Sequence, residues 1–109
     1  MTAVERAVLE RFKALVAGRL QVHKLILFGS RARGEADPES DVDVVVVLEG
    51  SADRAAKDFV SDCAWEAGFN HGLVLVPVVF GRNEWESGPE RDSIFVRLVE
   101  AEGVPCDRP

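Results

Sequence analysis

The sequence predicts a single α/β domain in which a small mixed three-stranded sheet is covered mainly on one face by helices. Three apolar, partly β-branched runs at residues 24–28, 42–48 and 73–80 have the length of buried strands. Segments with the apolar spacing of amphipathic helices alternate with these runs. The 109 residues contain no linker, internal repeat or low-complexity tract, so one domain is expected to span residues 1–109.

The first helix is predicted to precede the first strand. Thr2 and Glu5 have the spacing of a capping box, apolar residues follow at four-residue steps, and Gly18 is suited to end the helix. The first strand then runs into Gly29 and Ser30. Glycine and serine favour a tight change of direction, and we expect a brief helix to begin at Ser30.

The middle of the chain is predicted to contain a loop, a strand, a helix and an edge strand. Residues 35–40 have the composition of a loop, and the strand 42–48 follows. Ser51 is expected to cap the next helix, whose apolar stripe continues to Gly68. The third strand contains Pro77, which has no amide hydrogen for the ladder and therefore favours a sheet edge or a bulge.

The C-terminal part is predicted to contain a short helical turn and a last helix. The turn is expected around residues 84–86, and the helix is expected to open at Pro89 and to end at Gly103. The chain has two tryptophans. Polar neighbours make Trp85 a better candidate than Trp65 for contact with a partner protein.

The net charge of −6 is unevenly distributed. Residues 1–34 carry a net charge of +5, and the rest of the chain carries −11. Strong general binding to nucleic acid is not expected, because it depends on many basic contacts to phosphates, but the basic end can hold one small polyphosphate. No apolar run approaches the roughly 20 residues that span a bilayer, and no secretory pattern opens the sequence, so we expect a cytoplasmic protein without membrane contact.

Two aspartates, Asp41 and Asp43, stand at the start of the second strand. Residues two apart on a strand point to the same face, with Cα atoms about 6.5–7 Å apart. Like charges this close repel each other, whereas Mg²⁺ favours oxygen ligands and keeps water and phosphate in its shell. The pattern therefore indicates a metal site. The alternative is that the aspartates cap a loop or pair with Arg31 or Arg33.

Gly29 and Ser30 lie where a strand ends and a helical segment is expected to begin. Backbone N–H groups and a hydroxyl at such a position can bind an anion, and glycine leaves room for a phosphate. Arg31 and Arg33 add positive charge beside them. The alternative is a tight turn with Ser30 as an ordinary helix cap, but the aspartates on the next strand favour a joint site for a phosphate and its metal.

The combined motif resembles the signature of the minimal nucleotidyltransferase (MNT) domains of the DNA polymerase β superfamily, whose nucleotidyltransferase fold it implies. The residues that carry the resemblance are Gly29-Ser30-Arg31-Ala32-Arg33-Gly34 and Ser40-Asp41-Val42-Asp43. The resemblance implies a nucleotide-binding set of Gly29, Ser30, Arg31, Arg33 and Ser40. It also implies that Asp41 and Asp43 are catalytic residues that bind Mg²⁺, for which Mn²⁺ is an alternative.

The resemblance further implies transfer of a nucleotidyl group to a partner protein, with AMP from ATP as the first choice among triphosphates. Small proteins of this kind are often paired with an all-helical HEPN protein as antitoxin and toxin, so a HEPN/MNT pair is expected. Some members are thought to modify a tyrosine of that partner. This chain contains no tyrosine, so a tyrosyl acceptor would have to come from elsewhere.

One departure from the family pattern bears on activity. Active members carry a third carboxylate on the next strand, whereas the strand 73–80 contains no acid. Glu84 and Glu86 lie just beyond this strand, and Asp62 and Glu66 lie on the helix expected before it. The alternative function is therefore a catalytically degenerate module that binds a nucleotide or a partner. The sequence leaves open the acceptor, the preferred base, the identity of the partner and the oligomeric state.

Overall fold

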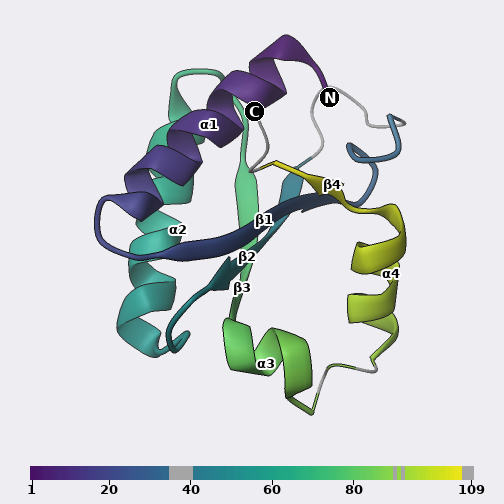
Figure 1. The fold of residues 1–109 in the computed structure, drawn as a ribbon. Coiled ribbons are helices and arrows are strands. Elements are labelled where there is room, and N and C mark those ends of the chain that lie inside the picture. The colour runs from purple at the N-terminus through teal and green to yellow at the C-terminus, as the bar shows by residue number, and fades with distance from the viewer. Residues whose placement is uncertain (35–40, 90, 92, 107–109) are drawn as a thin grey trace.

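The computed structural model describes residues 1–34, 41–89, 91 and 93–106. The elements, drawn in Figure 1, are α1 (Ala3–Ala17), β1 (Val22–Phe28), β2 (Val42–Leu48), α2 (Arg54–Phe69), β3 (Leu75–Gly81), α3 (Arg82–Ser87), α4 (Ile94–Glu102) and β4 (Val104–Pro105). The three predicted strands are present, with ends at most two residues from those predicted. The loop predicted at residues 35–40 lies outside the described residues. None of the described helices combines the length and the hydrophobicity needed to cross a membrane.

The sheet is mixed and has the strand order β3-β2-β1-β4. β1 runs antiparallel to both β2 and β4, whereas β2 and β3 are parallel. The predicted mixed sheet is confirmed, but it has four strands rather than three. The fourth strand consists of Val104 and Pro105 alone, which is too short to produce a recognisable period in the sequence.

The alternation of side chains along β2 separates two cores on opposite faces of the sheet. Val44 and Val46 belong to the larger core, with α1 and α2. Val45 and Val47 belong to the smaller core, with α3 and α4. All four valines are fully buried, which explains why this strand is apolar throughout. The predicted one-sided cover applies to the two long helices, while the short α3 and α4 cover the other face (Figure 1).

Pro77 lies on β3, at an edge of the sheet, in agreement with the prediction. The N–H of Val42 donates to the carbonyl oxygen of Val74 at 2.8 Å, so Val74 and every second residue after it direct their backbone groups toward β2. The backbone of Pro77 therefore faces the open edge, where its missing N–H interrupts no ladder bond. The proline also removes one donor that another strand could use for edge pairing.

Three predicted helix starts differ from the structure. The cap of α2 is Asp53 rather than Ser51, and its carboxylate accepts a hydrogen bond of 2.8 Å from the N–H three residues later. α4 is capped by Ser93 and does not open at Pro89. The brief helix predicted at Ser30 is a hydrogen-bonded turn. The first two differences arise because several residues can cap a helix and tertiary contacts select one of them.

The prediction that Trp85 contacts a partner is wrong. Trp85 is 2% exposed and packs against Phe80, with 5.2 Å between the ring centroids. Trp65 on α2 is instead 68% exposed and lies 5.4 Å from the ring of Phe69. The polar neighbours of Trp85 gave a misleading signal, because adjacent residues on a helix point in different directions.

Candidate active site

The end of β1 and the start of β2 bring the glycine–serine turn next to the two aspartates. Phe28, the last residue of β1, pairs with Asp43 in the antiparallel ladder. Gly29 follows directly, and Asp41 lies two residues before its partner. Asp43 alternates with the larger-core valines of β2 and therefore faces the side of α3 and α4. The fold thus joins the two parts of the motif into one site, as the sequence predicts.

Gly29 and Asp43 are in direct contact. A Cβ atom at Gly29 would lie only 2.7 Å from Oδ2 of Asp43. The backbone of Gly29 also has a φ of +75°, which side chains of L-residues rarely permit. The turn therefore favours glycine at this position, and a side chain there would force the carboxylate of Asp43 to move.

The two carboxylates act on each other electrostatically. Asp41 is exposed, whereas Asp43 is half-buried. Burial raises the pKa of Asp43, and the negative charge of Asp41 raises it further. The two carboxylates therefore favour the binding of a proton or of a metal cation.

The third carboxylate is absent from the strand beside this pair. The residue of β3 that pairs with Asp43 is Val76, which is 37% exposed. Asp62 and Glu66 lie on α2, against the opposite face of the sheet. In the part of the chain that the structure describes, no group of three metal-binding side chains is present. Asp41 and Asp43 remain as two possible carboxylate ligands.

The acids on α3 do not reach Asp43 either. α3 follows Gly81, which lies five positions along the ladder from Val76, or about 16 Å. Glu84 caps this helix by accepting a hydrogen bond of 3.0 Å from the N–H of Gly81. Glu86 lies on the same helix and forms an ion pair there, so neither acid replaces the missing carboxylate.

The turn at residues 29–34 keeps part of its backbone available. The N–H groups of Ala32 and Arg33 donate to the carbonyl oxygen of Gly29 at 3.1 and 3.4 Å. The N–H of Ser30 donates to no backbone carbonyl among the described residues. Ser30 is half-buried, so its N–H and hydroxyl are the groups of this turn best suited to bind an anion.

Arg31 holds the turn against the start of α1. Its guanidinium is buried, and Nη1 donates to Oε2 of Glu5 at 2.7 Å. The other oxygen of Glu5 accepts a hydrogen bond of 2.8 Å from the N–H of Thr2. Burial by itself raises the pKa of Glu5, but the hydrogen bonds from Thr2 and Arg31 outweigh it, so the pKa is lowered. A nucleotide contact for Arg31 stays a prediction.

The remaining predicted residues are Arg33 and Ser40. Arg33 is exposed, and its Nη1 lies 3.5 Å from Oε2 of Glu102. Ser40 lies outside the described residues. The sequence did not predict that Glu5 binds Arg31 of the turn, because the capping box already accounted for an acid at this position. Its partner, Arg31, lies 26 residues away.

Comparison with known proteins identifies similar domains and a similar fold. Residues 5–100 match the model of a family described as the nucleotidyltransferase domain. A Methanocaldococcus jannaschii protein named as a candidate protein adenylyltransferase is 28% identical over 99 residues, which are 89% of this chain and 93% of that protein. A second protein of the same organism, also named as a candidate protein adenylyltransferase, is 37% identical over 76 residues, which are 69% of this chain and 71% of that protein. One chain of a crystal structure of a toxin–antitoxin with AMP-PNP has the same fold, with a TM-score of 0.60 at 18% identity, over 96% of this chain and 73% of that one.

Proposed function

This chain belongs to the nucleotidyltransferase domain family, and we propose that it binds a magnesium–nucleoside triphosphate and transfers the nucleotidyl group to a partner protein. ATP is the triphosphate and AMP the transferred group in this proposal, in line with relatives named as candidate protein adenylyltransferases. Asp41 and Asp43 would hold the metal. Gly29 and Ser30 would hold the phosphates.

The observation that carries this proposal is the contact between Asp43 and the backbone of Gly29. It places a ligand for a cation directly beside a turn that can bind an anion. Two like charges held close together gain from a divalent cation, and Mg²⁺ accepts two protein carboxylates while water and phosphate oxygens complete its shell. When bound, Mg²⁺ would neutralise charge on the triphosphate.

The proposed reaction is an in-line displacement that the chain assists by positioning. A hydroxyl oxygen of the acceptor forms a bond to the α-phosphorus, and the bond from that phosphorus to the leaving pyrophosphate oxygen breaks. The hydroxyl proton passes to solvent. Because Val76 supplies no third carboxylate, we expect transfer to be about 10²–10⁴ slower than in a site with an activating group.

The acceptor is proposed to be an all-helical protein of the HEPN type, as the resemblance in the sequence implies, and the similarity to a chain of a toxin–antitoxin structure is in line with a protein partner. An exposed apolar surface at the β3 edge suits such a partner. Trp65, Val74 and Val76 line one hollow there, and Phe69 lies against Trp65. Val76 belongs both to this surface and to the ladder position beside Asp43. A protein bound there would therefore lie next to the carboxylates. Pro77 disfavours strand addition at the same edge, which favours side-chain contacts with a helix.

A second candidate function is a binding module without transfer. Val76 at the position of the third carboxylate favours it, because the site can then hold a nucleotide or partner without activating the acceptor hydroxyl. In a toxin–antitoxin pair, such a module would act on its partner by binding alone, without modifying it.

Titration calorimetry with ATP tests the binding half of the proposal. We expect binding in Mg²⁺, and at least a tenfold loss of affinity either without Mg²⁺ or in Asp43→Asn. The matched control is Glu10→Gln, an exposed carboxylate on α1 that should leave affinity unchanged. Equal affinity in every case would show that the metal–nucleotide assignment is wrong.

Incubation with α-labelled ATP and the partner purified with this chain from its native host tests the transfer half. Label on the partner that disappears in Asp43→Asn supports transfer. ATP binding without label in Mg²⁺ or Mn²⁺ supports the binding module. A Trp65→Ser variant should reduce labelling while leaving ATP affinity unchanged, because in this proposal Trp65 contacts the partner protein and does not contact ATP.

A further inference from the structure

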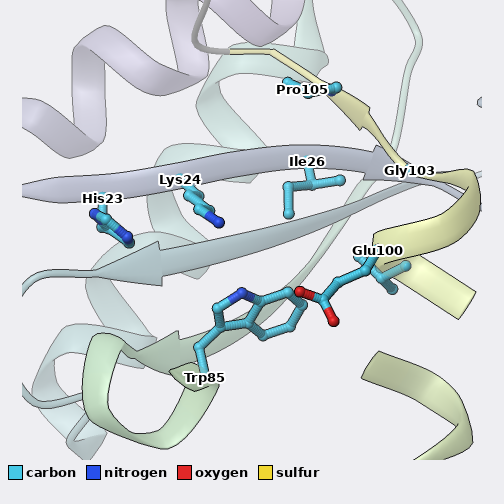
Figure 2. A pocket seen from close by; sticks show the side chains of 8 residues that line it. His23, Lys24, Ile26, Trp85, Glu100, Gly103 and Pro105 are labelled. Carbon is cyan, nitrogen blue, oxygen red and sulfur yellow. The ribbon is translucent and has the colours of Figure 1, made fainter. Parts of the chain in front are cut away.

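A pocket of about 370 Å³ lies between β1, α3 and α4. It is next to the part of the β1 edge that does not pair with β4. Figure 2 shows the side chains that line it, with the indole ring of Trp85 across its floor and the carboxylate of Glu100 beside that ring. Ile26 and Val99 supply apolar walls, and Lys24 lies above the indole. The pocket therefore combines a flat aromatic surface with groups of opposite charge.

The indole N–H of Trp85 has no partner in the described part of the chain. Trp85 as a whole residue is 2% exposed, and its Nε1 donates no hydrogen bond to a described residue. Figure 2 shows this nitrogen on the ring edge that faces β1, on the side of Lys24. The described residues contain no fully buried side-chain nitrogen or oxygen without a partner, so this N–H is not enclosed in the core and reaches the open space of the pocket. There it can donate to a ligand that carries an acceptor atom.

Glu100 supplies the complementary acceptor. Its Oε1 accepts a hydrogen bond of 2.6 Å from Arg91, and Oε2 accepts none from a described residue. The hydrogen bond from Arg91 lowers the pKa of Glu100, and the charges of Arg91 and Lys24 act in the same direction. Glu100 is therefore an ionised acceptor at neutral pH, and its free oxygen can accept from an amino group.

We propose that this pocket binds an amino-substituted nucleobase, adenine by preference, and so determines which triphosphate the chain uses. Adenine carries an exocyclic amino group that can donate to Glu100 and adjacent ring nitrogens that can accept from Trp85, and its planar ring can lie against the indole. Uracil and hypoxanthine lack the amino group. The inference rests on the proposed function, because it assigns the base of the same triphosphate.

The position of the pocket is consistent with one nucleotide reaching both sites. Ile26 and Phe28 point to the same face of the sheet as Asp43, and both pack in or against the smaller core. Ile26 lies two residues from Phe28 on β1, or about 7 Å along the strand, and Phe28 pairs with Asp43. The half-buried rings of Phe28 and Phe95, with centroids 5.3 Å apart, pack against the same core as Ile26, and Phe28 occupies the ladder position of Asp43. The ribose would lie along these rings.

A comparison of ATP with ITP tests the role of Glu100, because ITP has a carbonyl in place of the amino group and a hydrogen on the adjacent ring nitrogen N1. We expect the parent to bind Mg-ATP about tenfold more tightly than Mg-ITP, and Glu100→Gln to abolish that preference. The Glu10→Gln variant makes the same change of charge on α1 and should retain the preference. Equal binding of ATP and ITP by the parent would overturn this inference while leaving the proposed function intact.

Fluorescence of Trp85 gives a readout that does not depend on the phosphates. In a Trp65→Phe variant Trp85 is the only tryptophan, and we expect adenosine without metal to change its emission, with no such change on adding uridine. An adenosine response that persists in Asp43→Asn, together with failure of any triphosphate to bind, would retain the base pocket and reject the proposed triphosphate site. No response to adenosine or ATP would reject the pocket assignment.

Discussion

A side chain at Gly29 would collide with the carboxylate of Asp43 and would also need a backbone φ of +75°. These two constraints have different origins. The φ value belongs to the turn, whereas the collision belongs to the contact between β1 and β2. Gly34, in the same turn, has a φ of +72°, and apart from its chain neighbours no described residue has an atom within 4 Å of its hypothetical Cβ. Substitutions at the two glycines can therefore distinguish the effect of backbone strain from the effect of the contact with Asp43.

We predict that Gly29→Ala and Gly34→Ala each lower the free energy of unfolding by about 1–2 kcal/mol, because alanine is strained at positive φ. Only Gly29→Ala should also weaken binding of Mg-ATP, by about tenfold or more, since its Cβ displaces Asp43. Urea unfolding and calorimetry on both variants measure the two effects. Equal loss of ATP affinity in the two variants would show that the contact with Asp43 has no role in binding.

At the scale of elements, the parallel pairing of β2 with β3 determines which side chain lies beside the carboxylates. The register pairs Asp43 with Val76, and both strands continue for five more positions away from the site. The acids of α3 are consequently held at the far end of β3. A shift of register would be needed to bring them near, and the buried valines of β2 oppose it.

We predict that Val76→Asp increases the rate of nucleotidyl transfer by about 10²-fold, because it restores a carboxylate beside Asp43. Val76 is partly exposed, so the free energy of unfolding should fall by only about 1 kcal/mol. The matched control is Val76→Asn, which makes the same position polar without adding a carboxylate and should not raise the rate. Transfer of label from α-labelled ATP measures the effect, and an unchanged rate in Val76→Asp would place the missing group elsewhere.

At the scale of the whole molecule, two charged residues among those described are buried, and they pair with each other. Glu5 belongs to α1 and Arg31 to the turn after β1, so their ion pair joins the N-terminal helix to the candidate site. The pKa of Glu5 is lowered in the folded chain. Its contribution to stability is therefore present above the pKa that it has in the unfolded chain, and it is lost as the pH falls through the folded value.

We predict that Glu5→Gln lowers the free energy of unfolding at pH 7 by about 3 kcal/mol, because it removes the negative charge that pairs with the buried guanidinium of Arg31 at 2.7 Å. Below about pH 4 the difference between parent and variant should shrink, since the parent also loses the charge of Glu5 as it is protonated. Urea unfolding from pH 7 to pH 2.5 measures this convergence. The Glu10→Gln variant, on the exposed side of the same helix, should follow the parent throughout.

The sequence by itself determined the strands, the mixed sheet and the nucleotidyltransferase motif. These features depend on local patterns: β-branched runs mark the strands, Pro77 marks an edge, and the spacing of Gly29, Asp41 and Asp43 marks the site. The capping box at Thr2 is equally local, and the structure confirms it. Such signals can be read from neighbouring residues because hydrogen bonding and side-chain direction repeat over a few positions.

Only the tertiary structure decided which residues surround that motif. It placed Val76 beside Asp43, buried Arg31 against Glu5, moved Trp85 into the core and added β4 to the sheet. Each of these outcomes depends on contacts between residues far apart in the sequence. Their burial and pairing follow from the packing of whole elements, and no short pattern of residues encodes that packing.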